Sequence, residues 1–340
     1  MVTLKDIADE AGVSTATVSH VVNGNTSKVS RENALRIRKI IQKRQYVPNS
    51  SARTLAAKSS HIIAGILIGG AGDNLLKDPY NAEFFGEMVW AVQDHGYYLM
   101  IRYVNSYEEV VRSLRSWNID GAVFVGTSDR DIRKIQQGIQ IPLIFTDSYT
   151  DLKKISNVGI NDFQGGVLAA EHFLQKGHTK LGFVGYSTGE QGKNVVAERF
   201  NGFQSALARH AIELDTKRCF YVTDGDPRED IQRVADVLAA GKDTVSGVFV
   251  SADKLAVALL EALAERSIGV PEDISIIGYD DLPITSNAIP TLTTIRQDIS
   301  QKARIAIDLL FRQIEEKDKS PENITLDVTL VERDSVLQKS

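Results

Sequence analysis

The first 46 residues repeat apolar positions every three or four residues, the spacing of one face of an α-helix. These positions fall into three successive segments: Leu4, Ile7, Ala8 and Ala11; Val18, Val21 and Val22; Ala34, Ile37, Ile40 and Ile41. A residue that can cap a helix N-terminus precedes each segment, namely Thr3, Ser14 and Ser30. Gly12 can adopt the left-handed conformation that ends the first helix. The pattern predicts three short helices around one small core.

Two short helices joined by a tight turn with glycine, and a third packed behind them, predict a helix-turn-helix unit. The second helix of such a unit lies in the major groove, with its N-terminal end near phosphates and base edges. The short hydroxyl side chains of Thr15, Thr17 and Ser19 would let the helix lie deep in the major groove, and the longer His20 side chain can reach a guanine edge. His20 alone would also suit a solvated surface, but its neighbours favour DNA. From this helix we predict DNA contacts by Thr15, Ala16, Thr17, Ser19, His20 and Asn23.

The pattern changes after residue 61, where short apolar runs alternate with amphipathic stretches. The runs are residues 62–68, 98–104, 122–125, 143–145, 181–184, 248–250 and 274–277. The stretches between them include residues 84–95, 165–176 and 201–210. Strand and helix in alternation predict parallel sheets with helices on both faces. Because the segment is longer than one such sheet usually requires, we expect two α/β sheets.

The distribution of charge favours a polyanion partner for one end of the chain only. The whole chain has a net charge of −5. Residues 1–60 contain ten Lys or Arg and four Asp or Glu, giving +6, whereas the other residues contain 29 and 40, giving −11. A basic head on an acidic body is expected where only the head meets nucleic acid. A solvated basic helix over residues 36–44 is the alternative.

Several classes of protein fit the sequence poorly. The sequence contains no run of eighteen apolar residues, so we predict no membrane span. The N-terminus lacks the apolar core of a signal peptide. The single cysteine, Cys219, cannot form an internal disulfide, so we expect a cytoplasmic protein. There is no P-loop, no G-x-S-x-G elbow and no Cys/His metal cluster. We therefore predict neither an enzyme nor a protein with a cofactor, a metal or a membrane partner.

Two segments carry a specific family resemblance. Residues 3–24, TLKDIADEAGVSTATVSHVVNG, and residues 46–56, YVPNSSARTLA, resemble the DNA-binding headpiece and hinge of the lactose/galactose repressor family. The resemblance continues to Ser335. It implies a transcriptional repressor that binds a pseudo-palindromic operator as a homodimer. Many family members have arginine where this chain has His20, which leaves the operator sequence open.

The resemblance also implies a domain organisation. It gives a headpiece at residues 1–48, a hinge at 49–60 and an effector-binding body at 61–335. In the hinge, Ala52 and Leu55 would contact DNA, with Leu55 inserted as a wedge in the minor groove. The body would have two lobes like those of periplasmic sugar-binding proteins, joined by three crossings near Gly159, Pro290 and Pro321. Lobe 1 would contain residues 61–159 and 291–320, and lobe 2 residues 160–290 and 321–335.

A ligand in such a body lies between the lobes, where parallel strands end. The predicted effector-binding residues are Tyr80, Asp147, Arg199, Asp253 and Asp280, with Asp73 a weaker candidate. Arg199 and Asp280 match family positions that contact effectors. Carboxylates accept from vicinal hydroxyls and a guanidinium donates to ring oxygens, so a carbohydrate suits this set. For each acid alone, a helix cap or a surface charge is the alternative.

Other functions remain open at this point. Ala252 stands where some members have an asparagine. Pro227 stands where several members have an aromatic residue that stacks on the ligand, and this weakens the case for a purine ligand. A purine-responsive repressor and a catabolite-control regulator with a phosphoprotein corepressor are alternatives within the family. A sugar or chemotaxis receptor would need a signal peptide and would not use residues 1–58. The C-terminal residues show no leucine heptad, so we expect a dimer rather than a tetramer.

Overall fold

Three α-helices form the described part of the N-terminal unit. They are α1 (Leu4–Ala11), α2 (Thr15–Val22) and α3 (Arg31–Lys43), with the 3-10 helix η1 (Thr26–Lys28) before α3. The computed structural model describes residues 2–46, 59–68, 75–127, 129–149, 152, 155–187, 194–223, 227–241, 244–316 and 320–339. The chain divides into two units after Ser60. The predicted hinge contacts of Ala52 and Leu55, and Asp73, lie outside the described residues.

The helix boundaries of this unit follow from the caps that the sequence predicts. Thr3 and Asp6 form a reciprocal capping box at the start of α1, and Gly12 ends α1 with a φ of 66°. Ser14 caps α2 by accepting a hydrogen bond from the backbone N–H of Thr17 at 3.2 Å. The three helices bury one apolar cluster that includes Ile7, Val18 and Ile37, each with 0% exposed surface.

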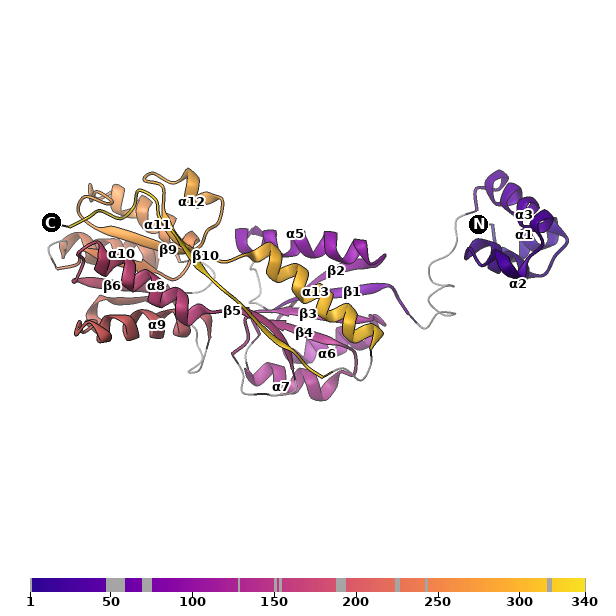
Figure 1. Ribbon diagram of the computed structural model, residues 1–340, viewed down its shortest axis with the longest axis horizontal. Coiled ribbons are helices and arrows are strands. Elements are labelled where there is room, and N and C mark those ends of the chain that lie inside the picture. The colour runs from indigo at the N-terminus through magenta and orange to yellow at the C-terminus, as the bar shows by residue number, and fades with distance from the viewer. Residues whose placement is uncertain are drawn as a thin grey trace. The chain divides into compact units, whose positions relative to one another are not determined.

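The second unit contains two six-stranded sheets (Figure 1). The first has the order β11-β5-β4-β3-β1-β2, and all of its pairs are parallel. Its strands are β1 (Ile62–Ile68), β2 (Tyr98–Val104), β3 (Gly121–Val125), β4 (Leu143–Thr146), β5 (Ser156–Ile160) and β11 (Asn323–Leu326). Its helices are η2 (Leu75–Lys77), α5 (Pro79–Asp94), α6 (Tyr107–Ser116), α7 (Asp129–Gly138) and α13 (Ile299–Glu315).

The second sheet has the order β12-β10-β9-β8-β6-β7. Its strands are β6 (Leu181–Tyr186), β7 (Cys219–Val222), β8 (Gly247–Val250), β9 (Ser275–Asp280), β10 (Thr293–Arg296) and β12 (Thr329–Val331). Its helices are α8 (Asp162–Gln175), α9 (Val195–Arg209), η3 (Thr216–Arg218), α10 (Arg228–Ala240), α11 (Asp253–Ala264) and α12 (Ile284–Asn287). The pair β10–β12 is antiparallel, whereas the other pairs are parallel.

Each sheet buries both faces, as parallel sheets require. In the first lobe, α5 and α13 pack on one face, against Ile63 and Leu67 of β1. The next residues along β1, Ala64 and Ile66, point to the opposite face, where α6 and α7 pack. In the second lobe α10 and α11 cover one face, and α8 and α9 the other. The predicted fold class, a helix-turn-helix headpiece with two doubly wound α/β lobes, is confirmed.

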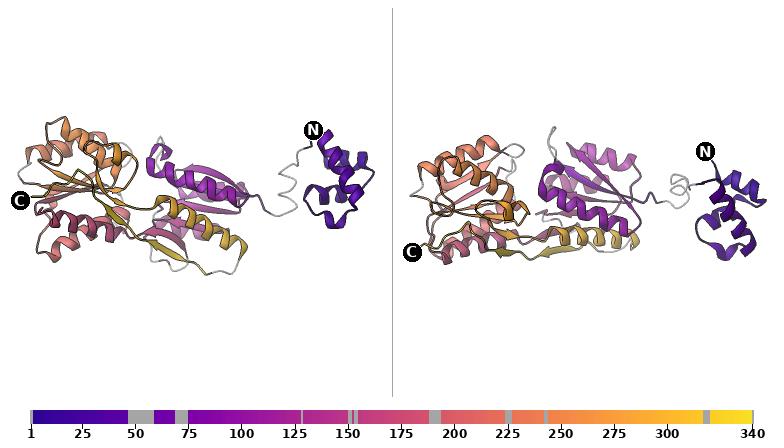
Figure 2. Two further views of the ribbon diagram at one scale, coloured as in Figure 1. Left: turned by 45° about the horizontal axis from the view of Figure 1, so that its top comes forward. Right: turned by 90° about the horizontal axis from the view of Figure 1, so that it is seen from above.

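The chain crosses between the lobes three times. It leaves the first sheet after Ile160, returns after Arg296, and crosses again between Leu326 and Thr329. Figure 2 shows the result for α13, which comes late in the sequence but lies with the early elements of the first lobe. No helix among the described residues is long and apolar enough to cross a membrane.

Two predicted boundaries between the lobes are wrong. Residues 293–296 were expected in lobe 1, but β10 pairs with β9 in the second sheet. Residues 323–326 were expected in lobe 2, but β11 pairs with β5 in the first sheet. The predicted boundaries lie at the prolines at 290 and 321, where the local pattern breaks. The strands that follow, β10 and β11, are short, and pairing with distant strands decides which sheet each one joins. Local sequence does not encode that choice.

Candidate functional sites

The exposed side of α2 carries the residues predicted to contact DNA. Val18 and Val21 point into the core of the unit, so Thr15, Ala16 and Asn23 are exposed on the other side of the helix. The side chains of Thr17, Ser19 and His20 are half-buried at the edge of this surface. The structure therefore places all six predicted α2 residues outside the core of the helix-turn-helix unit.

Some of these hydroxyl groups already have partners within the unit. The Thr17 hydroxyl and the Ser14 hydroxyl are 2.9 Å apart and hydrogen-bonded. The Asn23 amide donates to Ser19 Oγ at 3.3 Å. A hydroxyl that accepts one hydrogen bond can still donate another to a phosphate. Ser19 is therefore both a phosphate-binding candidate and a support that orients Asn23.

The basic charge on the unit is partly neutralised. Glu10 on α1 accepts from Arg44 Nε at 2.7 Å and from Lys43 Nζ at 3.4 Å. The Arg44 hydrogen bond lowers the pKa of Glu10 below its usual value, which keeps this carboxylate ionised. Lys43 and Arg44 thus contribute less to a DNA-binding field than their number suggests.

A cavity of about 380 Å³ lies between the two lobes of the body. A volume of this size is typical of small-molecule sites. Four of the five predicted effector residues line it, namely Tyr80, Asp147, Arg199 and Asp280. Asp147 follows β4, and Asp280 ends β9, so both carboxylates stand where parallel strands end. The two sheets therefore present their carboxyl ends to one shared space.

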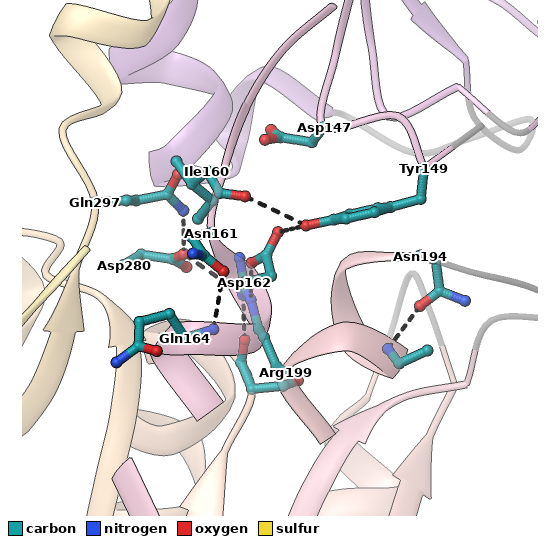
Figure 3. A network of polar contacts seen from close by, with 12 residues as sticks. Asp147, Tyr149, Ile160, Asn161, Asp162, Gln164, Asn194, Arg199, Asp280 and Gln297 are labelled. Atoms are coloured by element: carbon teal, nitrogen blue, oxygen red, sulfur yellow. Dashed lines mark hydrogen bonds and ion pairs between the residues drawn. The ribbon is translucent and has the colours of Figure 1, made fainter. Parts of the chain in front are cut away.

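Arg199 is held in one orientation by three kinds of contact, of which Figure 3 shows the one to Asp162. Its Nε donates to Asp162 Oδ1 at 2.7 Å, and its Nη1 donates to the carbonyl of Ser251 at 2.5 Å. The guanidinium carbon lies 3.5 Å from the centroid of the Tyr279 ring, close enough for a cation–π contact. Burial opposes the charge of Arg199, but Asp162, Tyr279 and Asp280 together outweigh this effect, and the pKa of Arg199 lies above its usual value.

Two glycines allow the close packing of α8 and α9 that brings Arg199 to Asp162. A β-carbon at Gly166 would lie 2.0 Å from the carbonyl oxygen of Arg199. A β-carbon at Gly202 would lie 1.9 Å from the carbonyl oxygen of Phe163. Each helix thus approaches the backbone of the other at a position without a side chain. The distance between the two helices, and with it the position of Arg199, depends on these glycines.

Asp280 faces Arg199 from the end of β9. Its Oδ1 lies 3.7 Å from Arg199 Nη1 and accepts from the side-chain amide of Gln297 at 2.6 Å. Burial raises the pKa of Asp280 to about 6, although Arg199 acts in the opposite direction. A carboxylate with this pKa changes charge within the range of ordinary buffers.

Asp147 lies on the opposite lobe and shares its network with a buried lysine. Asp147 Oδ2 accepts from the Tyr80 hydroxyl at 2.9 Å and from Lys302 Nζ at 2.7 Å. Lys302 Nζ also donates to Gln297 Oε1 at 2.8 Å. Burial, together with the charge of Asp147, raises the pKa of Tyr80 well above its usual value, so the phenol stays protonated as a donor.

Comparisons with known proteins match both units of the chain. Residues 3–49 match the model of bacterial regulatory proteins of the lacI family, and residues 170–336 match a periplasmic binding protein-like domain. The chain is 30% identical to the HTH-type transcriptional repressor PurR of Pasteurella multocida (strain Pm70) over 349 residues, which cover 99% of each chain.

The chain belongs to the lacI family of bacterial regulatory proteins. The resemblance inferred from the sequence is confirmed, and the protein is a DNA-binding transcriptional repressor of that family. The ribose operon repressor of Haemophilus influenzae (strain ATCC 51907 / DSM 11121 / KW20 / Rd) is 27% identical over 99% of each chain. The lac repressor dimer bound to operator and the anti-inducer ONPF is a structural neighbour, with a TM-score of 0.86, 26% identity and 99% of each chain covered.

One predicted effector residue of this family member does not line the cavity. Asp253 is 0% exposed at the start of α11. Its Oδ1 accepts from the Thr294 hydroxyl at 2.6 Å, and its Oδ2 accepts from the backbone N–H of Leu282 at 2.9 Å. Both oxygens therefore fasten β10 and the loop after β9. The neighbours Ala252 and Lys254 line the cavity instead.

Several residues of the site were missed by sequence reasoning. Asp162, Gln297 and Lys302 all belong to the polar network, but none was predicted. Asp162 lies two residues after the end of β5, at the start of α8, so the rule that ligands gather at strand ends could have found it. Lys302 interrupts the apolar stripe of α13, and a lysine on a buried helix face is itself a signal of function or pairing. Gln297 carries no local signal.

Proposed function

We propose that this repressor binds a pseudo-palindromic operator through α2 and that a small polyhydroxylated molecule, a carbohydrate, controls its operator affinity from the cavity between the lobes. The observation that carries the proposal is the facing pair of Arg199 and Asp280 in the wall of that cavity, with Asp162 buried behind Arg199 and holding its guanidinium. These groups offer both donors and acceptors to vicinal hydroxyls. The similarity to a ribose operon repressor supports the same ligand class.

The control would act through the relative position of the lobes. Asp147 and Tyr80 belong to the first lobe, and Arg199 and Asp280 to the second, so one ligand that bonds to both sets favours one arrangement of the lobes. A change in that arrangement would alter operator affinity. By linkage, the operator must change effector affinity by the same factor. An inducer and a corepressor are both compatible with this geometry.

A homodimer is the proposed assembly for binding both halves of the operator. Two exposed aromatic residues support a surface for it: Trp90 on α5 is 67% exposed, and Tyr98 on the edge strand β2 is 71% exposed. Exposed aromatic side chains and open sheet edges are each typical of an interface. The related lac repressor binds its operator as a dimer.

A purine base is the second candidate ligand, since the relative with 30% identity is designated PurR. Two tyrosines, Tyr80 and Tyr186, line the cavity and offer aromatic surfaces against which a base could stack. A phosphoprotein corepressor is the third candidate. It would require no ligand in the cavity.

The test is fluorescence anisotropy with a pool of palindromic operators, repeated with neutral sugars, sugar phosphates and purines. A sugar that changes operator affinity supports the proposal, and the sign of the change distinguishes an inducer from a corepressor. In Asp280→Asn the response to that sugar should be lost, while operator affinity without sugar is kept. Asp236→Asn is the matched control, because Asp236 pairs with Arg266 on the surface of the second lobe. The proposal of a carbohydrate effector would be refuted if only a purine changed operator affinity. It would also be refuted if the protein bound the operator tightly and no compound had an effect.

A further inference from the structure

Lys302 is a fully buried cation behind the wall of the cavity. It lies in the first turn of α13 with 0% exposed surface, next to Ala303, which packs in the core of the first lobe. Burying an ammonium group is unfavourable unless the group is paired and hydrogen-bonded. Its Nζ lies 2.7 Å from Asp147 Oδ2, 2.8 Å from Gln297 Oε1 and 4.9 Å from the centroid of the Tyr80 ring. All three neighbours line the cavity.

These contacts fix the orientation of Gln297. Because its Oε1 accepts from Lys302, its amide nitrogen points the other way and donates to Asp280 Oδ1 at 2.6 Å. Gln297 lies in the chain segment that crosses from β10 to α13. Hydrogen bonds therefore link four side chains in a continuous path from the first lobe to the second: Asp147, Lys302, Gln297 and Asp280. A side chain that cannot donate at position 302 would free the Gln297 amide to flip.

The same contacts decide which atom of Asp147 remains available. Lys302 and the Tyr80 hydroxyl both bond to Oδ2. The other oxygen, Oδ1, is buried and has no hydrogen-bond partner among the described residues. A buried carboxylate oxygen without a partner is costly, so a ligand that donates to it gains the missing hydrogen bond. Among the described residues, Asp147 Oδ1 is thus a buried acceptor that no protein donor satisfies, and a ligand would have to reach it by displacing what covers it.

We propose that Lys302 is a positioning residue that holds Asp147 and Asp280 as two fixed acceptors and thereby restricts the effector to neutral molecules with adjacent hydroxyl groups. The proposal rests on the proposed function and narrows its ligand class. Lys302 already donates hydrogen bonds to Asp147 and Gln297. Arg199 Nε already donates to Asp162, and its Nη1 donates to the Ser251 carbonyl. Of the other cations that line the cavity, Lys254 pairs with Asp78 at 3.4 Å and Lys77 is exposed to solvent. The carboxylates of Asp147 and Asp280 would therefore repel a phosphate or carboxylate group placed between them.

The ligand class is tested on the full-length protein by thermal shift and calorimetry. The probes are D-ribose, D-glucose and cellobiose, the phosphate esters of the two monosaccharides, and hypoxanthine. The expected result is binding of at least one neutral sugar and weaker binding, by about tenfold or more, of its phosphate ester. A phosphate ester that binds more tightly than its parent sugar would overturn this inference. The proposed function, control of the repressor by a small molecule, would still hold. If no probe binds, the proposed function and this inference both fail.

The role of Lys302 is tested with the neutral sugar that binds and with its epimer at one hydroxyl. Lys302→Met should weaken the sugar about tenfold or more and reduce the preference over the epimer, because both carboxylates lose their fixed orientation. Lys302→Gln, which can donate one hydrogen bond to Asp147, should recover part of the preference. Arg304→Met is the matched control, since Arg304 lies on the same helix and pairs with Glu87 on the surface.

A purely structural role for Lys302 would give a different result. Reduced stability alone would weaken the sugar and its epimer by the same factor, so that the preference between them would not change. An unchanged preference in Lys302→Met, with wild-type preference also in Lys302→Gln, would overturn the positioning role. Circular dichroism of each variant shows whether it is folded at the temperature of the titration.

Discussion

Gly166 on α8 lies against the backbone carbonyl of Arg199 on α9, so closely that a β-carbon at residue 166 would be 2.0 Å from that oxygen. The helix pair would have to separate to admit even one methyl group. Because Arg199 reaches Asp162 from the other helix at 2.7 Å, the same separation would disturb the cavity. A residue without a side chain thus determines the position of the arginine that the proposed ligand needs.

We expect Gly166→Ala to lower the free energy of unfolding of the body by roughly 1–3 kcal/mol, the usual cost of overpacking. Both tryptophans of the chain, Trp90 and Trp117, belong to the body, so tryptophan fluorescence in urea follows this unit. Gly86→Ala is the control. Gly86 is exposed in the middle of α5, and a β-carbon there meets nothing within 4 Å. That variant should be unchanged or up to about 1 kcal/mol more stable. Equal effects of the two substitutions would contradict the close packing.

Asp280 should make the stability of the body fall as the pH rises through the mildly acidic range. Its pKa of about 6 in the folded protein lies above the ordinary value of 3.8, so the folded state binds this proton more tightly than the unfolded chain. Ionising it between about pH 4 and pH 6 therefore costs stability. We expect the stability of Asp280→Asn relative to the wild type to rise by about 2 kcal/mol between pH 4.5 and pH 7.5.

Urea unfolding at pH 4.5, 6 and 7.5 measures this difference. Asp236→Asn is the control, because the hydrogen bond from Arg266 lowers the pKa of Asp236 and its contribution is lost only below its ordinary value. The difference between that variant and the wild type should be flat over the same three pH values. A flat difference for Asp280→Asn as well would show that Arg199 keeps Asp280 ionised throughout.

His178 should make the body sensitive to acid. The ring is 0% exposed and its Nε2 donates to the carbonyl of Leu337 at 2.8 Å, which holds the C-terminal segment on the second lobe. Burial lowers the pKa of His178 below its usual 6.5. Its contribution is therefore present above about pH 6.5 and is lost as the pH falls through the lower, folded pKa.

We expect His178→Gln to be less stable than the wild type at pH 7.5 and to lose less stability on acidification. Circular dichroism during urea unfolding at several pH values gives the comparison. His210→Gln is the control, because His210 is exposed at the end of α9. Parallel pH curves for the wild type and His178→Gln would mean that His178 does not contribute to the acid response.

His20 should read one base position of the operator. It lies at the edge of the exposed surface of α2, beside Ser19. We expect His20→Ala to cost about 1–3 kcal/mol at one base pair and to relax specificity there. Lys5→Ala should instead weaken all sequences alike and reduce the dependence on salt. Binding selections from a randomised operator pool show the difference, and a uniform loss in His20→Ala would exclude a base contact.

Trp90 should contribute to the dimer. We expect Trp90→Glu to shift the protein from dimer to monomer at micromolar concentration in sedimentation experiments, because a charge replaces an apolar contact. Trp117→Glu is the control. Trp117 is 49% exposed after α6, a helix that packs on the opposite face of the first sheet from α5. A dimer that survives Trp90→Glu and dissociates in Trp117→Glu would place the interface on the other face.

The sequence by itself determined the elements whose signals are local. The caps at Thr3 and Ser14 and the left-handed Gly12 set the helix-turn-helix, because each acts through its own backbone neighbours. Continuous apolar runs predicted central strands such as β1 and β3, since strands buried on both faces need no alternation. The family resemblance and the rule that ligands gather at strand ends together indicated four residues of the cavity.

Only the tertiary structure decided the features that depend on distant partners. The short strands β10 and β11 join sheets that their local sequence does not specify, which moved two lobe boundaries. Asp253 satisfies both oxygens with Thr294 and the loop after β9, so it fastens the second lobe and does not face the cavity. Lys302 gains its role from Asp147, which is far away in sequence. A pattern of residue types cannot reveal such pairs, because the energy of a buried charge depends on what folding places beside it.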